Sequence, residues 1–240
     1  MTDDVDALRR ELKASREAAQ SASQELQDVV YAIGHDLRAA LRNVMSYSQL
    51  LQRQQGLPEQ SAEFTALILQ GATEMNAFID DVLAFSRAGG AGRRTTVQLN
   101  AIVQWAMTKW PAGTFGPGAA DLQMHGLPEV HVNESEFVLL FQHLIGNALR
   151  YAGTDRPSIL ISSDEGPDSW AISVQDNGPG IAPEFHKQVF APFKRLHGKD
   201  IPGRGLGLAI CRKIIRAHGG EIWVESNGQH GSTFKFSVPF

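Results

Sequence analysis

Residues 133–152 read NESEFVLLFQHLIGNALRYA, and this stretch decides how the second half of the chain folds. Asn133 is suited to cap a helix, because its side-chain oxygen can accept a hydrogen bond from an amide of the first turn. Apolar side chains then recur at helical spacing on one face: Phe137, Leu140, Phe141, Leu144 and Ala148. We therefore predict an amphipathic helix whose apolar face packs into a core.

Strand-like and helical runs surround this helix. SILISS (158–163), WAISVQD (170–176), GEIWVES and STFKFSVPF predict strands, and EVHV (129–132) predicts a short one. We expect Asn227-Gly228 to join the last two strands as a tight hairpin turn. Further helices are predicted over residues 99–110 and after the glycine-rich turn GRGLGL. The economical fold for this order is a mixed β-sheet covered by helices on one face.

The N-terminal part carries a heptad pattern. Small or apolar positions alternate in steps of three and four: Val5, Leu8, Leu12, Ser15, Ala19, Ala22, Leu26, Val29 and Ile33. The seam shifts at Leu37 and Leu41 and continues through Val44, Ser48 and Leu51. After a break in which Gly56 ends one helix and Pro58 opens the next, a second stripe follows: Phe64, Ile68, Gly71, Met75, Phe78, Val82 and Phe85.

These stripes predict a coiled coil and a helical hairpin that needs a partner. One helix cannot bury such a stripe alone, and two hairpins close a four-helix bundle, most simply as a homodimer. The alternative is a helix that folds back on its own chain. The stretch AGGAGRRTT, from Ala88, indicates a flexible linker. We assign residues 1–88 to the all-α hairpin, 89–96 to the linker and 97–240 to a second domain.

Composition narrows the function classes. The chain has 240 residues, enough for one or two domains, and a formal charge of -4 that disfavours nucleic-acid binding through a broad basic surface. Its one cysteine, Cys211, excludes an intrachain disulfide and a zinc site built from cysteines. We find no apolar run near the ~18 residues that span a bilayer and no signal-peptide core, so we expect a cytoplasmic protein with no direct membrane span.

Three polar or glycine-rich groups suit a nucleotide. In DNGPGI, Gly178 and Gly180 allow the backbone to approach a flat ligand, and Asp176 offers a carboxylate to an exocyclic amine. In GRGLGL, Gly203, Gly205 and Gly207 turn amides toward phosphates at the start of a helix. Asn147 lies among apolar residues, with Arg150 and Tyr151 about one turn later and His143 one turn earlier. An isolated asparagine there would more often be a structural residue.

His35 lies on the water-facing side of the first helix. It is two residues from both Ile33 and Leu37, which is about 200° around the axis from each. Asp36 is its neighbouring carboxylate. On its own, an exposed histidine beside an aspartate is more often an ordinary surface residue.

Taken together, five segments in this order resemble the H, N, G1, F and G2 boxes of sensor histidine kinases of two-component signalling: AIGHDLRAAL, LIGNALRYA, DNGPGI, FAPFKR and GRGLGL. The likeness runs from about residue 25 to residue 240. The stretch HDLRAALRNVMSYSQLL also looks like the dimerisation helix of bacterial phytochrome-type kinases. The resemblance implies an α/β sandwich shared with gyrase-type ATPases, preceded by a phosphoacceptor hairpin, and an upstream sensor module missing from this chain.

The resemblance also implies roles for individual residues. His35 would accept the phosphoryl group with help from Asp36, and Asn147 would be the Mg²⁺ ligand of an ATP site. Asp176 would anchor adenine, Tyr151 would line the base, and Arg150 would stand near the phosphates. Gly178 and Gly180 would form the nucleotide floor; Gly203, Gly205 and Gly207 would close over the phosphates. The partners would be a second copy of the chain and the receiver domain of a response regulator.

The chain departs from the family pattern at four positions. Ala40 stands where proline is usual, so no proline kink is expected near the histidine. Ala39 replaces the threonine or asparagine that orients a hydrolytic water, which puts phosphatase activity in doubt. His143 replaces an asparagine, and Arg204 replaces a threonine in the glycine-rich turn.

Two other functions stay open: a dimeric signalling scaffold that binds nucleotide with weak or no kinase activity, and a gyrase-type ATP hydrolase.

Overall fold

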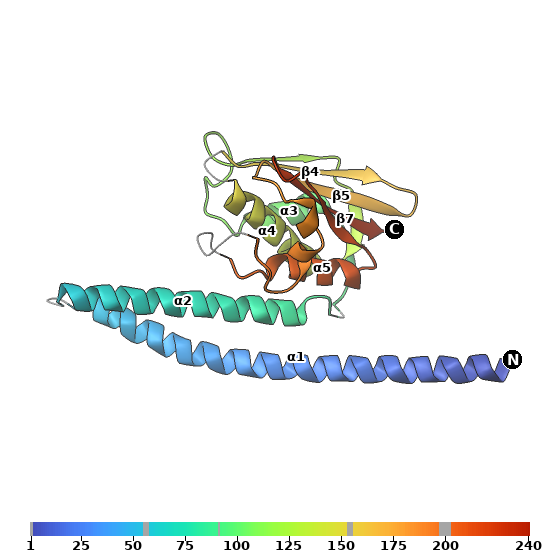
Figure 1. Cartoon of the computed structure of the whole chain (residues 1–240), viewed down its shortest axis with the longest axis horizontal. Coiled ribbons are helices and arrows are strands. Elements are labelled where there is room, and N and C mark those ends of the chain that lie inside the picture. The colour runs from blue at the N-terminus through green and yellow to red at the C-terminus, as the bar shows by residue number, and fades with distance from the viewer. Residues whose placement is uncertain (1, 55–57, 91, 153–155, 197–202) are drawn as a thin grey trace. The chain divides into compact units, whose positions relative to one another are not determined.

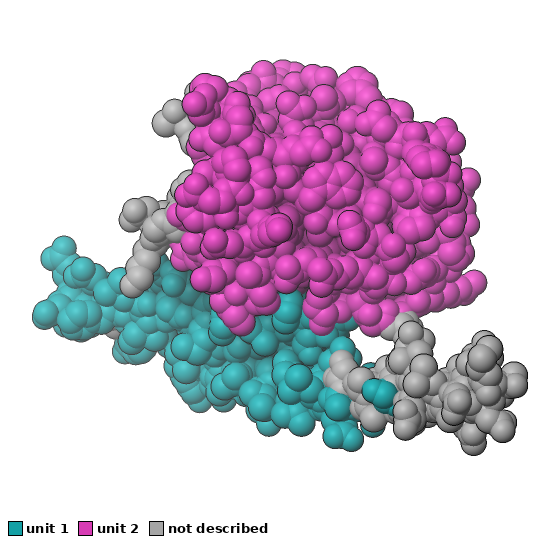
Figure 2. Space-filling model, turned by 45° about the vertical axis from the view of Figure 1, so that its right-hand side comes forward, with its two compact units in different colours: residues 1–87 teal, residues 88–240 magenta. Residues whose placement is uncertain are grey.

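A computed structural model describes residues 2–54, 58–90, 92–152, 156–196 and 203–240. The chain forms two compact units, Met1–Arg87 and Ala88–Phe240 (Figure 1, Figure 2). Within the described residues, no helix is both long and apolar enough to cross a membrane. The predicted end of the first helix at Gly56, and the side chains of Val5, Leu8, Leu12 and Ala19, lie outside the described residues.

Unit 1 is a helical hairpin of α1 (Thr2–Gln52) and α2 (Glu59–Arg87). Its core consists of Leu41, Ala72, Ile79 and Leu83, with Val30 and Met45 packed against it. Gly34 lies against this core, and a Cβ at that position would lie 2.8 Å from a methyl carbon of Leu83, so a larger residue would force Leu83 to move. Arg38 joins the two helices by donating from Nε to Asp80 Oδ1 at 2.9 Å.

The hairpin leaves much of both predicted stripes exposed. On α1 the helices pack through the face that holds Gly34, Leu41 and Ser48, all buried. The large apolar side chains left exposed on the stripes are Leu26, Val29, Ile33, Leu37, Val44, Leu51, Phe64, Ile68, Met75 and Phe78. Leu41 and Ser48 belonged to the predicted seam but are buried inside the hairpin, on the face that also holds Gly34.

Unit 2 is built on a mixed sheet of five strands in the order β2-β4-β5-β7-β6. The pair β2 and β4 is parallel, and the other neighbours are antiparallel. The strands are β2 (Asp121–His125), β4 (Ser158–Glu165), β5 (Ser169–Asp176), β6 (Ile222–Glu225) and β7 (Ser232–Pro239). A separate antiparallel pair consists of β1 (Thr95–Gln98) and β3 (Glu129–Val132).

Three helices cover one face of this sheet, which confirms the predicted architecture (Figure 1). They are α3 (Leu99–Met107), α4 (Glu134–Tyr151) and α5 (Gly207–Ala217), and two short 3₁₀ turns, η1 (Pro183–Phe185) and η2 (Gln188–Phe190), precede α5. The helix predicted over residues 133–152 is α4, and the Asn133 side chain accepts from the Glu136 amide as expected. Its apolar face packs on the sheet, with Phe236 edge-on to Phe137 and Phe141.

Three details of the predicted layout differ from the structure. We did not predict β2, a short strand that follows a loop rich in glycine and proline and that lies at the sheet edge in parallel pairing with β4. Strand β1 begins at Thr95, inside the range assigned to the linker, because it pairs with β3. The prediction of a tight hairpin turn at Asn227-Gly228 was wrong.

A longer loop from Ser226 to Gly231 takes the place of that turn. Ser226 Oγ donates to Gly231 O at 2.7 Å and accepts from the Ile181 amide at 2.9 Å. Asn227 uses its side-chain oxygen to accept from the amides of Gln229 and His230. These hydrogen bonds pair the polar groups of a wider turn and connect this turn to the segment that follows β5.

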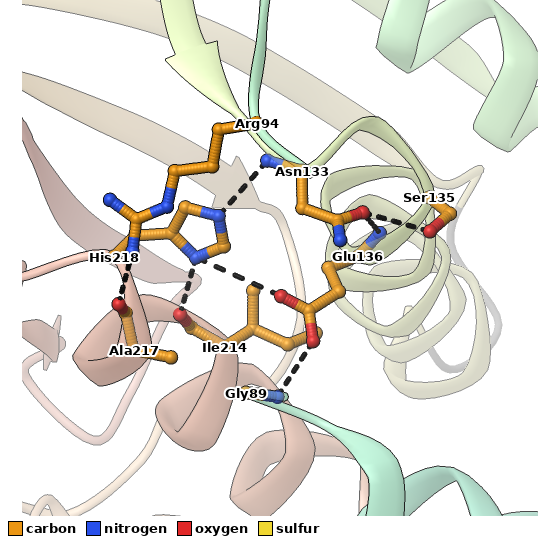
Figure 3. A network of polar contacts seen from close by, with 8 residues as sticks. All are labelled: Gly89, Arg94, Asn133, Ser135, Glu136, Ile214, Ala217 and His218. Atoms are coloured by element: carbon orange, nitrogen blue, oxygen red, sulfur yellow. Dashed lines mark hydrogen bonds and ion pairs between the residues drawn. The ribbon is translucent and has the colours of Figure 1, made fainter. Parts of the chain in front are cut away.

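A buried histidine links the start of α4 to the end of α5 (Figure 3). His218, at the end of α5, accepts from the Asn133 amide at Nε2 (3.0 Å), so Nδ1 carries the proton and donates to Ile214 O (2.8 Å). These two bonds fix the orientation of the ring. The ring also packs edge-on against Phe137, with centroids 5.0 Å apart.

The first residues of unit 2 are hydrogen-bonded to residues beside His218. The Gly89 amide donates to Glu136 Oε1 at 2.7 Å, and Arg94 Nη2 donates to Ala217 O at 2.6 Å. Figure 3 shows both bonds on either side of His218. The segment that leaves the hairpin is therefore anchored to the beginning of α4 and the end of α5.

We expect His218→Ala to lower the free energy of unfolding of unit 2 by about 2–4 kcal/mol, since it leaves a buried amide unpaired and opens a cavity beside Phe137. Urea denaturation of the full chain, followed by tryptophan fluorescence, measures this, because all four tryptophans lie after Ala88. The control is His230→Ala, in an exposed loop. Equal midpoints for the two variants would contradict the structural role of His218.

Candidate functional site

Unit 2 contains an open cavity of about 90 Å³ beside α4. Four of the residues predicted for a nucleotide site line it: Asn147 and Tyr151 from α4, Asp176 at the end of β5, and Gly180 after it. Ile181, Val189, Leu208 and Phe234 contribute apolar wall, and Lys194 and Arg195 contribute cations. An apolar slot with a few polar groups and basic residues suits a flat, anionic ligand.

Asp176 is held in place by backbone amides. Its Oδ1 atom accepts from Gly178 N at 2.9 Å and from Ser232 N at 3.1 Å. Burial raises the pKa of the Asp176 carboxyl, and these two hydrogen bonds oppose that rise. No residue that the structure describes donates to Oδ2. This oxygen is thus available to a donor on a ligand in the cavity.

The two glycines after Asp176 leave no room for side chains. A Cβ on Gly178 would lie 3.0 Å from Asp176 Oδ1 and 3.1 Å from Tyr151 O. Gly180 has φ +82°, and a Cβ there would lie 2.9 Å from the Gln229 amide. The chain therefore passes close to α4 and to the loop after β6, and glycine is required at the second position by both backbone conformation and space.

The glycine-rich turn lies beside the polar residues of α4. Gly203 is next to Arg150, since a Cβ on it would lie 3.5 Å from Arg150 Nη1. Gly205 has φ +72° and accepts at its carbonyl from the Phe193 amide at 2.9 Å. A Cβ on Gly207 would lie 3.0 Å from His143 Nδ1. As far as the described residues define it, the cavity wall does not include these glycines, Gly178 or Arg150.

Arg150 and Asn147 contact each other on α4. Arg150 Nη1 donates to Asn147 Oδ1 at 3.4 Å, a long and weak bond. The Asn147 oxygen is therefore only loosely engaged, and Arg150 is exposed toward Gly203. These contacts place an amide oxygen and a guanidinium at the cavity's edge.

His143 is a residue whose role we could not assign from the sequence. Burial, together with the nearby cations Lys109 and Arg150, lowers the pKa of its imidazole to about 4. Its Nε2 atom is buried without a hydrogen-bond partner among the described residues. The sequence signal was the histidine one turn before Asn147, but burial could not be predicted from it.

His35 and Asp36 belong to the other unit. On α1, His35 Nδ1 lies 3.2 Å from Asp36 Oδ1, and the two side chains are 65% and 85% exposed. The imidazole faces solvent, as we predicted from its place on the helix. The structure thus divides the predicted residues between an exposed histidine–aspartate pair in unit 1 and a cavity in unit 2.

The residues near Asn147 fit a divalent cation held mainly by a phosphorylated ligand. Across the described ranges, no three His, Cys, Asp or Glu side chains cluster in a way that could hold a metal ion alone. Mg²⁺ in nucleotide sites is bound through one or two protein groups and the phosphates. The loosely engaged oxygen of Asn147 matches that requirement.

Two family models match the chain. Residues 25–91 match the His Kinase A (phospho-acceptor) domain, and residues 132–240 match the histidine kinase-, DNA gyrase B- and HSP90-like ATPase. The Phytochrome-like protein Cph1 of Synechocystis sp. is 35% identical over 95% of this chain and 32% of its own length. The Adaptive-response sensory kinase SasA of Synechococcus sp. is 30% identical over the whole chain and 65% of its own length.

Solved structures agree on the fold. Full-length ShkA in complex with AMPPNP matches with a TM-score of 0.70 at 23% identity, over 89% of this chain and 46% of that one. The catalytic domain of the histidine kinase ThkA matches with a TM-score of 0.51 at 28% identity, over 62% of this chain and 98% of that one. The chain spans about a third of the length of its phytochrome relatives. It belongs to the histidine kinase family, with a phosphoacceptor domain followed by an ATPase domain.

Proposed function

We propose that this chain is an ATP-dependent protein histidine kinase that phosphorylates His35 and passes the phosphoryl group to an aspartate of a response regulator. The observation that carries the proposal is the exposed His35–Asp36 pair on the helix that matches the phosphoacceptor domain. The cavity in the ATPase domain also supports the proposal, because it offers a place for the nucleotide to bind.

The pair is suited to nucleophilic attack on phosphorus. A neutral imidazole has one protonated nitrogen and one lone pair. Asp36 holds the proton on Nδ1 of His35, which leaves the lone pair on Nε2. As the bond between Nε2 and the γ-phosphorus forms and the bond to the bridging oxygen breaks, ADP leaves and the ring gains positive charge. The Asp36 carboxylate stabilises that charge.

We assign the residues in and near the cavity roles in binding ATP. Asp176 Oδ2 accepts from the adenine amine, Tyr151 lines the base, and the close backbone at Gly178 and Gly180 forms the floor. Arg150 and the turn with Gly203, Gly205 and Gly207 lie on the phosphate side. Asn147 holds Mg²⁺, which neutralises charge on the phosphates when bound. ShkA, a structural neighbour, binds the ATP analogue AMPPNP.

The exposed stripes support a homodimer. Apolar side chains such as Ile33, Leu37, Ile68 and Met75 are left in solvent by one hairpin, and a second hairpin would cover them in a four-helix bundle. We assign residues 1–88 to this phosphoacceptor domain, 89–96 to the linker and 97–240 to the catalytic domain. The likeness to the Phytochrome-like protein Cph1 supports the role of an output module of a phytochrome-type sensor. We further propose that this module acts in the cytoplasm on a receiver domain.

Incubation of the full chain with Mg²⁺ and γ-labelled ATP separates the candidate functions. We expect acid-labile, alkali-stable label on the protein, as a phosphohistidine gives. Nucleotide binding without label would favour the signalling scaffold instead. Free labelled phosphate without labelled protein would favour the hydrolase, for which the chain has His143 rather than a water-activating glutamate.

We also expect Asp176→Asn to weaken ATP binding about tenfold or more, because it removes a charge-assisted hydrogen bond to adenine. Binding needs the ionised carboxylate, so the affinity of the native chain should fall as the pH drops through the raised pKa of Asp176. That loss therefore begins at a higher pH than for an ordinary aspartate. Calorimetric titration with AMPPNP from pH 8 to pH 5 measures both effects. An unchanged affinity in the variant would remove Asp176 from adenine recognition.

A further inference from the structure

An arginine one turn after His35 forms an ion pair between the two helices of unit 1. Arg38 Nε donates to Asp80 Oδ1 at 2.9 Å, and Arg38 Nη2 donates to the same oxygen. The two side chains are 31% and 48% exposed, so the ion pair lies at the surface of the hairpin. Solvent-exposed ion pairs contribute little to folding free energy. The pair therefore adds little to the stability of the hairpin.

This ion pair fixes a positive charge beside the predicted phosphoacceptor. Arg38 and His35 are three residues apart on α1, so their side chains share a face of the helix, with about 5–6 Å between Cβ atoms. At the same turn, Gly34 is buried against Leu83, so α1 and α2 approach closely there. Asp80, three residues before Leu83 on α2, receives the Arg38 guanidinium. Asp80 thus restrains the guanidinium near His35.

Phosphorylation of His35 would bring a large negative charge to this turn. A phosphate on a side chain carries a charge of about −1.5 to −2 at pH 7. The carboxylate of Asp80 repels such a group, whereas the guanidinium of Arg38 attracts it and matches its geometry. A guanidinium has five N–H donors, and Asp80 receives two of them at a single oxygen. Arg38 can therefore donate to a second anion without leaving Asp80.

We propose that Arg38 binds the phosphoryl group on His35 while Asp80 holds the guanidinium in place. This inference rests on the proposed function, because it takes His35 to be the phosphoacceptor. Arg38 forms no covalent bond and keeps its protons. It stabilises the negative phosphoryl oxygens once the bond from phosphorus to His35 Nε2 has formed and ADP has left. Because the Asp80 carboxylate offsets part of the guanidinium charge, the ion pair sets the equilibrium between ATP and phosphohistidine.

Equilibrium labelling of the full chain at fixed concentrations of ATP, ADP and Mg²⁺ tests this role, because it reports the stability of the phosphohistidine. Arg38→Met should lower the ratio of phosphorylated to free His35 about tenfold. Asp80→Asn keeps an oxygen that accepts from the guanidinium but removes the opposing charge, so the ratio should rise about threefold. The control is Arg42→Met, which removes an exposed charge two turns after His35 and should leave the ratio unchanged.

The opposite signs of these two effects distinguish phosphoryl binding from a purely structural role. If the pair only joined α1 to α2, both substitutions would weaken the hairpin and both ratios would fall. A native ratio in Arg38→Met, or a ratio that does not rise in Asp80→Asn, would overturn the inference and leave the kinase assignment in place. Where Arg38→Met fails to fold, Asp80→Asn alone decides. Absence of label from the native chain would overturn both the inference and the proposed function.

Discussion

Replacing Asn147 with alanine is expected to reduce labelling of the protein by γ-labelled ATP to less than about one hundredth of the native level. Phosphoryl transfer depends on positioning and on neutralising the charge of the phosphates, and the variant lacks the amide oxygen that we assign to Mg²⁺. Asn147 lies at the cavity rather than in the apolar core, so folding and dimerisation should be unchanged. Labelling rates and sedimentation of the full chain measure these quantities.

Asn100→Ala is the matched control, because it removes the same side chain from an exposed helical position in the same unit. It should label at the native rate. Native labelling in Asn147→Ala would exclude the proposed metal role, and a changed sedimentation coefficient would show that the variant acts through assembly.

Asp36→Asn is expected to slow phosphoryl transfer about a hundredfold with little change in ATP affinity. The variant keeps a hydrogen-bonding side chain next to His35 but loses the charge that stabilises the imidazolium as the N–P bond forms. ATP affinity should be unaffected, because Asp36 belongs to unit 1 and the cavity to unit 2. Single-turnover labelling at saturating ATP gives the rate, and calorimetry with AMPPNP gives the affinity.

Asp28→Asn serves as the comparison, since Asp28 is an exposed aspartate about two turns earlier on the same helix. Its transfer rate should equal that of the native chain. The same result for Asp36→Asn would mean that the carboxylate beside His35 has no part in the chemistry.

Much of the fold follows from local sequence chemistry. The cap at Asn133 and the apolar face from Phe137 to Ala148 are properties of one segment, so α4 could be predicted in place. We missed strand β2 because it is short and its parallel partner, β4, lies far along the chain. The prediction of a turn at Asn227-Gly228 was wrong for a similar reason, because Ser226 accepts a hydrogen bond from Ile181 in a distant segment.

The residues of the candidate site also divide into those that the sequence predicts and those whose role depends on the folded structure. The resemblance to histidine kinases implied that Asn147, Tyr151, Asp176 and Gly180 belong to one site, and these residues line one cavity. The need for glycine at Gly205 is visible only in three dimensions, where a Cβ would meet Lys194 O at 2.6 Å. The burial and unpaired nitrogen of His143 likewise depend on the packing of α4 against α5.

The most direct test is to locate the phosphoryl group after the native chain reacts with Mg²⁺ and ATP. Mass spectrometry of peptides kept at alkaline pH should find a phosphohistidine at His35, and the acid-labile label should be absent from His35→Ala, which should still bind AMPPNP with native affinity. A native level of label in His35→Ala, or a phosphorylated residue elsewhere in place of His35, would contradict the central claim that the solvent-facing imidazole of α1 accepts phosphorus from a nucleotide bound in unit 2.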